Sequence, residues 1–273
     1  NGLWFHNTLN DTFEKINITN LKRQEATDVR TVFKDSKGRI WVGSNISINV
    51  YNANLKLLAS FENNTNGLKG SNTESIIEDK NGTIWLGIYG GGFFKFNENH
   101  NVLQNSSFSN HTYTNPNNKH DIPSIKSMAI DDSGNIWQIN NQNRLLKFNT
   151  EKETHNTFED IESLNELSLK SVLIEGNDNI WMGTNSGICH LDIKNNNLQM
   201  YYWSDGVQGN IFMPRSAFND KKGTLYFGGV NGLNYFNPKT INKKISSPKL
   251  YITTIEILNQ PIDSLFPSQT NLS

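Results

Sequence analysis

The chain has 273 residues, with 25 Lys and Arg against 26 Asp and Glu and a formal net charge of −1. A near-neutral chain has no electrostatic basis for binding nucleic acid or an anionic membrane surface, so we expect neither partner. The one cysteine, Cys189, excludes an internal disulfide, and no apolar run approaches the roughly 20 residues that cross a bilayer. Any membrane link is therefore expected from segments outside this sequence.

Two short apolar runs open the chain, at residues 2–7 and 13–18, and their alternation predicts strands. Residues 2–7 match residues 232–237 near the other end of the sequence, where they would be the third strand of a repeating unit. We therefore expect residues 1–20 to be a partial unit without its first two strands, and the chain to be cut from a longer protein.

Five later segments share one frame, with an acidic residue, a glycine three positions on and an aromatic residue six positions on. The glycines are Gly38, Gly82, Gly134 and Gly223. The aromatic residues are Trp41, Trp85, Trp137, Trp181 and Tyr226, at intervals of 44, 52, 44 and 45 residues. The fourth segment departs from the frame, with Asp178 in the glycine position. A period of about 40–50 residues made of short strands is typical of β-propeller blades.

Each unit is interpreted as four short strands, exemplified in order by residues 29–33, 40–42, 187–191 and 57–61. The sequence thus predicts an all-β fold, a propeller of four-stranded antiparallel blades over residues 1–245. Full blades are expected at residues 21–64, 65–114, 115–157, 158–203 and 204–245. The chain would then hold about five and a half blades of an expected total of about seven.

The repeated acid and the repeated aromatic residue are both interpreted as structural. An aromatic residue found once per blade beside a turn is expected to pack between neighbouring sheets, and the glycine supplies the positive φ that closes the turn. The acids, Asp35, Asp79, Asp131 and Asp220, lie one to a blade and so do not form a coordination cage. The histidines show no metal-ligand spacing either. We expect the acids to cap turns, and we expect neither a metal nor another cofactor.

The repeat stops at residues 237–238. Residues 246–248 indicate a linker, residues 250–258 a new alternating strand and residues 259–262 a turn. Residues 246–273 are therefore expected to be a linker and the first strands of a second β domain.

Residues 79–92 and 175–188 resemble the repeat of the two-component regulator propellers, found in hybrid sensor histidine kinases that control glycan utilisation in gut Bacteroidetes. Residues 205–212 and 225–238 are similar to the final blade of that family. Residues 248–259 resemble the opening of the immunoglobulin-like triple-tyrosine domain that follows the propeller. The resemblance covers essentially the whole chain, and it is most specific in the last blade and the strand after it.

The resemblance implies a periplasmic sensor region, usually dimeric, that detects an oligosaccharide and signals to glycan-utilisation genes. In such a protein a transmembrane helix and the histidine kinase, receiver and DNA-binding domains come later in the chain. None of these parts is recognised in the sequence, so we expect no enzymatic activity from this chain.

An incomplete ring leaves strand edges and blade flanks exposed, whereas closure removes them. We therefore expect self-association or homodimer formation, or pairing with upstream blades of the parent protein.

Two other functions remain open. One is a propeller that only binds proteins. The other is a sialidase-like glycoside hydrolase, whose turns carry an acid two residues before the glycine, where only Asp132 lies here. A sialidase also needs three clustered arginines, and no pair of carboxylates stands out as the chemistry of glycoside hydrolysis requires.

The loops that join blades share a face with the turns after the second strands, and such loops commonly bind ligands. Aromatic residues there would stack on sugar rings, and Lys or Arg would pair with a sulfate or uronate. Packing or turn formation is the alternative role for each residue. The candidate ligand-binding residues on this face are Tyr89, Lys126, Trp203, Asn210, Phe212 and Arg215.

Overall fold

The computed structural model describes residues 2–19, 25–114, 124–158, 161, 164, 166–220 and 222–241, and the backbone of residues 256–257 and 260–261. The chain divides into two compact units, Asn1–Pro238 and Lys239–Ser273. Within the described ranges, no helix has the length and apolar character needed to cross a bilayer.

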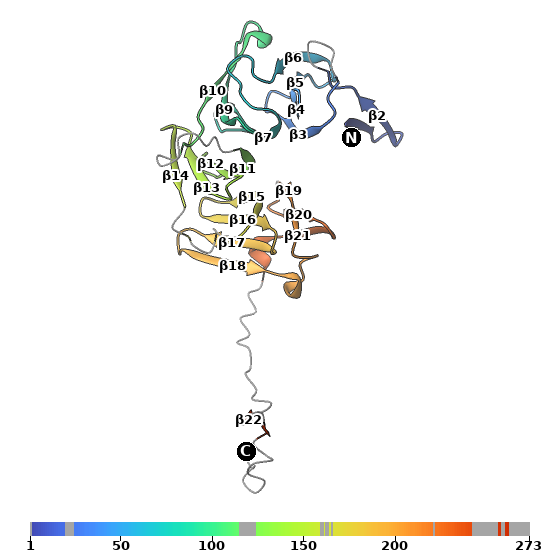
Figure 1. Cartoon of the computed structure of the whole chain (residues 1–273). Coiled ribbons are helices and arrows are strands. Elements are labelled where there is room, and N and C mark those ends of the chain that lie inside the picture. Colours follow the sequence, from blue (N-terminus) through green and yellow to red (C-terminus); the bar gives the residue numbers. More distant parts are fainter. Residues whose placement is uncertain are drawn as a thin grey trace. The chain divides into compact units, whose positions relative to one another are not determined.

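The first unit consists of antiparallel sheets whose strands follow chain order (Figure 1). A hairpin comes first, with β1 (Leu3–Asn7) and β2 (Thr12–Ile16). The first sheet contains β3 (Val29–Lys34), β4 (Ile40–Ser44), β5 (Ser47–Tyr51) and β6 (Leu57–Glu62). The second sheet contains β7 (Thr73–Glu78), β8 (Ile84–Ile88), β9 (Gly92–Asn97) and β10 (Ser107–Asn110). The third sheet contains β11 (Ile125–Ile130), β12 (Ile136–Asn140), β13 (Leu145–Asn149) and β14 (Thr154–Thr157).

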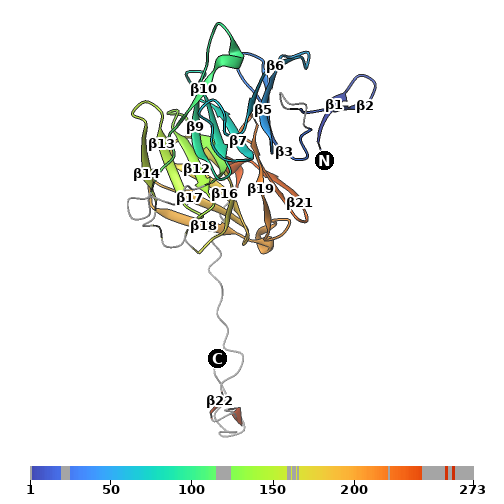
Figure 2. The ribbon, with the colours of Figure 1, turned by 45° about the horizontal axis from the view of Figure 1, so that its top comes forward.

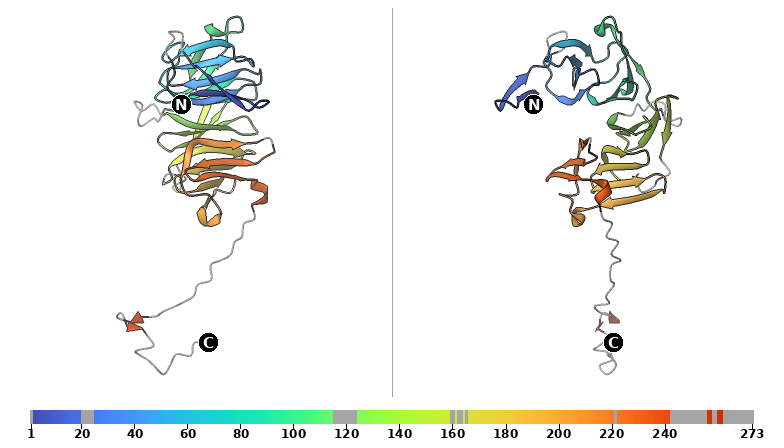
Figure 3. Two further views of the ribbon diagram at one scale, coloured as in Figure 1. Left: turned by 90° about the vertical axis from the view of Figure 1, so that its right-hand side faces the viewer. Right: turned by 180° about the vertical axis from the view of Figure 1, so that it is seen from behind.

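The fourth sheet contains β15 (Leu169–Glu175), β16 (Asn179–Thr184), β17 (Ile188–Asp192) and β18 (Asn197–Tyr201). The fifth sheet contains β19 (Phe212–Asn219), β20 (Leu225–Gly229) and β21 (Gly232–Phe236). Three short 3-10 helices are η1 (Leu103–Asn105), η2 (Trp203–Asp205) and η3 (Pro238–Thr240). The tilted view of Figure 2 and the side view of Figure 3 show the sheets succeeding one another in chain order.

The first strands of the five sheets, β3, β7, β11, β15 and β19, gather at the centre of the unit, and later strands lie progressively outward (Figure 1). This is the arrangement of propeller blades, so the prediction of an all-β propeller with mostly four-stranded blades is confirmed.

The fifth blade, predicted to have four strands within residues 204–245, has three in the described residues. Pro238 follows β21 almost at once and begins η3, and a proline cannot donate a ladder hydrogen bond. The predicted strand at residues 250–258 lies largely outside the described residues. There the structure describes only β22 (Glu256–Ile257), which pairs with β23 (Gln260–Pro261).

The repeated acid caps its turn and also holds the aromatic residue. Oδ1 of Asp79 accepts the backbone N–H groups of Asn81 and Thr83, both at 2.9 Å, while Oδ2 accepts Nε1–H of Trp85 at 2.8 Å. The corresponding indole bonds to Asp35 and Asp131 measure 2.8 and 3.1 Å. The frame glycines of these turns and of the fifth have φ between 77° and 86°, where a Cβ would be strained.

The tryptophans join each sheet to the next one. Ring centroids lie 4.9 Å apart for Trp41 and Phe96, 5.0 Å for Trp85 and Phe148, and 5.0 Å for Trp181 and Phe236. Trp137 is buried in a cluster that includes Leu191 of the fourth sheet. The partner in each case comes from the third strand of the following sheet, so a short repeat in sequence becomes a repeated contact between blades.

The fourth sheet keeps the packing but changes the turn. Glu175 pairs with Asn179, and Gly176, at φ 67°, takes the positive φ in place of the missing frame glycine. The bond from acid to indole is not formed in this sheet, and Nε1 of Trp181 is buried with no hydrogen-bond partner among the described residues.

Candidate functional site

One face of the propeller carries the loops that connect successive sheets. Each first strand begins beside the turn between the second and third strands of its own sheet. Backbone hydrogen bonds fix this neighbourhood, from Asn45 to Asp28 at 3.0 Å and from Asn185 to Ser168 at 3.2 Å. We call this the loop face, and we call the opposite face, with the acid-capped hairpins, the turn face.

Near the loop face, each first strand contains a break in its pairing with the second strand. The residue left out of the ladder is Arg30 in β3, Glu74 in β7, Lys126 in β11 and Lys170 in β15. In β19 the break is longer, between Phe212 and Ala217, and contains Arg215. A bulge frees a residue from the ladder and re-aims its side chain. Five equivalent positions therefore present a charged side chain each; we call them the bulge residues.

A central cavity of about 780 Å³ is lined by all five first strands. Arg30, Glu74 and Arg215 line it toward the loop face, while Phe218 and Asp220 belong to the part of β19 and its turn nearer the turn face. The cavity thus has apolar walls in its middle and charged groups at both ends, with Lys34 and Asp220 toward the turn face.

Glu74 organises two of the bulge residues. Its side chain is 7% exposed, and Oε1 lies 3.7 Å from Nη1 of Arg30, while Oε2 contacts Nη1 of Arg215. Arg30 also donates from Nε to Asp28 at 2.5 Å. Burial and the neighbouring Arg30 lower the pKa of Arg215. One buried carboxylate therefore holds two guanidinium groups close to each other.

Lys126 and Lys170 form a second pair of like charges. Nζ of Lys126 donates to Oδ1 of Asn143 at 3.3 Å. Burial and the nearby Lys170 lower the pKa of Lys126. In the part of the chain that the structure describes, neither lysine has a carboxylate within ion-pair distance.

The predicted ligand residues fall into several places. Lys126 and Arg215 are bulge residues, and of the two Arg215 lines the central cavity. Trp203 lies in η2, 70% exposed, and its backbone N–H donates to Oδ1 of Asn210 at 3.4 Å. The carbonyl of Asn210 accepts the N–H of Gly187 at 2.7 Å, so Asn210 ties its loop to the fourth sheet.

Tyr89 is 55% exposed in the turn between β8 and β9. It lines a surface pocket of about 710 Å³ together with residues 67–71, separate from the central cavity. The structure therefore does not bring Tyr89 together with the bulge residues.

The prediction that Phe212 contacts a ligand needs correction. Its side chain is 1% exposed and packs edge-on against Phe227. A Cβ on Gly183 of the fourth sheet would lie 3.1 Å from that of Phe212, so the ring fills the space between two sheets. Packing explains this residue.

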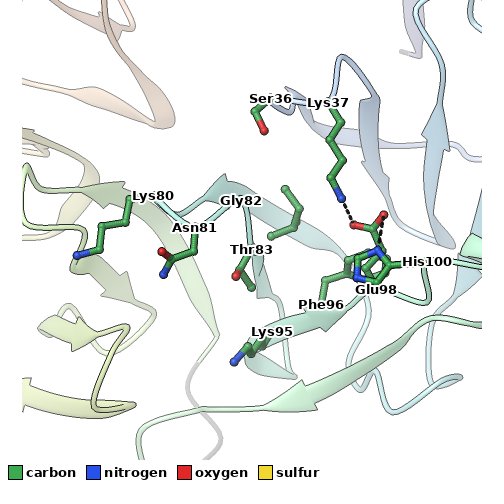
Figure 4. Close-up of a pocket in the computed structure, with 11 residues that line it drawn as sticks. Ser36, Lys37, Lys80, Asn81, Gly82, Thr83, Lys95, Phe96, Glu98 and His100 are labelled. Carbon is green, nitrogen blue, oxygen red and sulfur yellow. Dashed lines mark hydrogen bonds and ion pairs between the residues drawn. The ribbon is translucent and has the colours of Figure 1, made fainter.

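A pocket of about 550 Å³ also opens on the turn face (Figure 4). Its cations are already paired. Lys37 lies 2.7 Å from Glu98, Lys80 lies 2.7 Å from Glu151 and Lys95 lies 2.8 Å from Glu153. Each pair joins neighbouring sheets, so the charges here serve blade packing and leave no cation free for a ligand.

Sequence reasoning missed Arg30, Glu74 and Lys170 as members of the site. A signal was present, because a charged residue followed by Ser or Thr recurs in every first strand, at residues 30–31, 74–75, 126–127, 170–171 and 215–216. Aligning the repeats on their tryptophans would have shown it in four of the five.

Known proteins match this chain in sequence and in fold. The two-component regulator propeller family matches residues 24–45 and 67–90. Histidine kinase P4 of Formosa agariphila is 23% identical over 315 aligned residues, covering 96% of this chain and 22% of that protein. The chain therefore spans about a fifth of that relative.

Two solved structures from B. thetaiotaomicron share the fold. One is the extracellular domain of a hybrid two-component system, with a TM-score of 0.66 and 23% identity over 94% of this chain and 36% of the other. The second, the extracellular domain of a one-component system, has a TM-score of 0.68 and 21% identity over 86% of this chain and 30% of the other.

The repeats identified in sequence, the blades seen in the structure and these similarities agree. The chain contains two segments that match the two-component regulator propeller family, it is similar in sequence to histidine kinase P4, and it shares its fold with the extracellular domains of two-component systems.

Proposed function

We propose that this chain is the ligand-sensing part of the extracytoplasmic, periplasmic region of a hybrid two-component sensor histidine kinase. The observation that carries the proposal is the similarity to a histidine kinase along 96% of the chain. The description of the structural relatives as extracellular domains supports the location. Binding of a ligand by the propeller would be passed to a kinase elsewhere in the parent protein.

The ligand that we propose is an oligosaccharide, with glycan-utilisation genes as the regulated target. Trp203 and Tyr89 expose their rings on the loop face, and an exposed aromatic ring stacks well on a sugar. Arg30 and Arg215 line the central cavity toward the same face and supply hydrogen-bond donors for hydroxyl or acidic groups.

A screen of the 273-residue chain against neutral and acidic oligosaccharides tests the proposal by thermal unfolding. A ligand at 100 times its Kd stabilises the folded state by about 2.7 kcal/mol and so raises Tm. We expect at least one saccharide to do this, and W203A or Y89A to weaken its binding without lowering the Tm of the free chain. If no saccharide of the panel shifts Tm or gives heat on titration, the proposed sensing function is wrong.

A glycoside hydrolase is not supported by the carboxylates of the central cavity. Glu74 is held by two arginines, and Asp220 accepts the turn amides of Lys222 and Thr224 at 2.8 Å. Both are committed to structural partners, whereas glycoside hydrolysis needs one carboxyl group to donate a proton and a second one to attack or activate water.

We further propose that the parent propeller has about seven blades and that residues 246–273 begin an immunoglobulin-like triple-tyrosine domain. The resemblance of residues 248–259 to that domain supports the second part, and the β22–β23 pair is compatible with a β fold. A structure of the parent periplasmic region would test both; a helical segment at residues 246–273 would contradict the second.

Self-association is also part of the proposal. Large apolar side chains are exposed on the β1–β2 hairpin and on the fifth sheet, including Trp4, Phe13, Leu233 and Tyr235. Exposed apolar surface of this kind favours contact with another protein surface. Light scattering over a concentration series should show dimers or larger species, with W4S and F13S shifting them toward monomer. A monomer at all concentrations would contradict it.

A further inference from the structure

In three of the five blades, the residue directly after the second strand is an asparagine that holds the loop leading into its sheet. Its Oδ1 accepts a backbone N–H of that loop. The three bonds run from Asp28 to Asn45 at 3.3 Å, from Ser124 to Asn141 at 3.0 Å and from Ser168 to Asn185 at 3.1 Å. In the second blade this position is Tyr89, whose side chain has no amide oxygen. The second blade thus replaces a loop-holding side chain with an aromatic ring.

The backbone of Tyr89 is held on both sides of the ring. Its N–H donates to the carbonyl of Asn72 at 2.8 Å, and its carbonyl accepts the N–H of Ser71 at 2.9 Å. The next N–H, of Gly90, donates to Oγ of Ser124 at 2.8 Å, and Ser124 is buried. The turn that carries the ring is therefore fixed to the loops leading into two successive sheets.

Glycines bring the loop before β7 against this turn, backbone to backbone. A Cβ on Gly70 would lie 2.7 Å from both the N atom of Gly91 and the O atom of Tyr89, and a Cβ on Gly91 would collide with the carbonyl oxygen of Lys69. Neither position therefore accepts a larger residue without displacing the backbone. Leu68, buried in the core, anchors the same loop. The ring thus lies beside a wall of fixed backbone.

The ring of Tyr89 remains open at the edge of its surface pocket of about 710 Å³. It is 55% exposed, and among the described residues it neither stacks on another aromatic ring nor has a hydrogen-bond partner for its hydroxyl group. Lys69 lines the same pocket, with no carboxylate of the described ranges within ion-pair distance of Nζ. Packing within the chain therefore does not account for the exposed part of the ring.

The lining of the pocket favours one class of ligand. Apart from Tyr89 and the buried Leu68, the lining residues are Gly, Ser, Asn and Lys. Such a site offers one apolar surface surrounded by hydrogen-bonding groups. A pyranose has the matching character, because one face of its ring presents C–H groups and its edge carries hydroxyl groups. An aromatic side chain supplies the surface for that face.

We propose that the Tyr89 pocket is a saccharide subsite separate from the central cavity. One pyranose ring stacks on Tyr89, and Lys69 donates a hydrogen bond to a hydroxyl or carboxylate oxygen of the same saccharide. The volume of the pocket lies within the range of ordinary small-molecule sites. This inference rests on the proposed function, because it gives the sensed saccharide a place on the loop face.

The test is titration calorimetry on the full 273-residue chain with a neutral galactan oligosaccharide and an oligogalacturonate of equal length. The variant Y89N introduces the asparagine found at this position in three other blades, so the loop should stay in place and Tm should equal or exceed that of the wild type. The variant Y89F keeps the ring. The control Y235A removes a ring that is 71% exposed and lies outside the pocket.

We expect at least one of the two saccharides to bind. Y89N should weaken this binding by about tenfold, the loss of one stacked ring, whereas Y89F and Y235A should change it by less than about twofold. K69M should weaken it by a few-fold, the loss of one hydrogen bond. In saturation-transfer NMR, the C–H protons of one pyranose should receive the strongest signal in the wild type and lose it in Y89N.

The outcomes separate the subsite from the proposed function. A saccharide that binds the wild type and Y89N equally well would overturn the subsite and leave the sensor function standing. Absence of binding by both saccharides and by the wider panel would overturn the sensor function and the subsite together. If Y89F binds as weakly as Y89N, or Y89N lowers Tm, the ring acts through its hydroxyl group or through the fold, and the stacking role is wrong.

Discussion

Lys80 on the turn face and Lys126 on the loop face belong to neighbouring sheets, but their surroundings differ. Nζ of Lys80 lies 2.7 Å from Oε1 of Glu151 in the next sheet, so its charge is paired within the protein. Nζ of Lys126 donates to the amide oxygen of Asn143, and no carboxylate of the described residues lies within ion-pair distance of it. The turn face uses charge to join blades, and so does Glu74 on the loop face, whereas Lys126 has no such carboxylate partner among the described residues. Charge at a repeated position therefore has to be judged by its partners.

The largest expected effect tests the structural role of charge on the turn face. D79A removes the acceptor of two turn amides and of the buried Trp85 indole, and a buried donor without a partner is costly. We expect a loss of about 3 kcal/mol in the free energy of unfolding, measured by urea denaturation. D220A is the matched control, because Tyr226 is half-buried and its hydroxyl bond to Asp220 is long at 3.4 Å. An equal loss in both variants would contradict the role of the indole bond.

Acid should weaken the third sheet close to the turn face. Burial against Phe93 and Phe148 lowers the pKa of His155 to about 4. The unfolded chain takes up this proton near pH 6.5 and the folded chain only near pH 4, so stability is full above 6.5 and falls as the pH drops through this window, by up to about 3 kcal/mol. Unfolding measured from pH 7 to pH 4 checks this.

The variant H155Q should flatten that pH dependence, because it removes the titrating group. The lowered pKa of Glu153, from its hydrogen bond with Lys95, acts in the same direction but further toward acid. The same slope in wild type and H155Q would show that other groups carry the acid sensitivity.

The ion pairs of the turn face should differ among themselves in strength. Glu98 contacts both Lys37 and Arg39 and is largely shielded, so E98Q should lower stability by about 1 kcal/mol, less at high salt. Glu151 is well exposed, and E151Q should change stability within the error of denaturant melts. A larger loss of stability for E151Q than for E98Q would contradict the expectation that an ion pair shielded from solvent contributes more than an exposed one.

The smallest effect has the opposite sign. K126M removes one of two repelling charges on the loop face and keeps the apolar stem, so stability should rise by a few tenths of a kcal/mol, about the size of one like-charge pair. The variant K80M on the turn face should show no such rise in stability. A loss of stability in K126M would mean that Lys126 contributes to folding. The contrast drawn between Lys80 and Lys126 would then be wrong.

The blades could be predicted because their signals are local. The frame that ends in Trp85 combines an acid, a positive-φ glycine and a strand, all within seven residues, and the structure shows each part as expected. The three strands that the described residues show in the fifth blade were less visible, because the turn frame at Asp220 says nothing about the end of its blade.

The site was predicted only in part. Lys126 and Arg215 were found by their place near connecting loops, but the pairing of Arg215 with Glu74 depends on bulges, which come from pairing between strands and have a weak local signal. Phe212 was misassigned because a loop-side aromatic residue and an inter-sheet residue look alike in sequence, and only the neighbouring Gly183 distinguishes them.

The bulges also bear on how such proteins diversify. When a blade is duplicated, the acid-capped turn and the tryptophan contact are copied with it, and most changes there harm folding. A bulge residue lies outside the ladder, so it can be exchanged without breaking the strand pairing. Arg, Glu and Lys already stand at equivalent positions of five blades here. One inherited scaffold can thus acquire a new ligand preference by exchanging a single residue per blade, while its architecture stays the same.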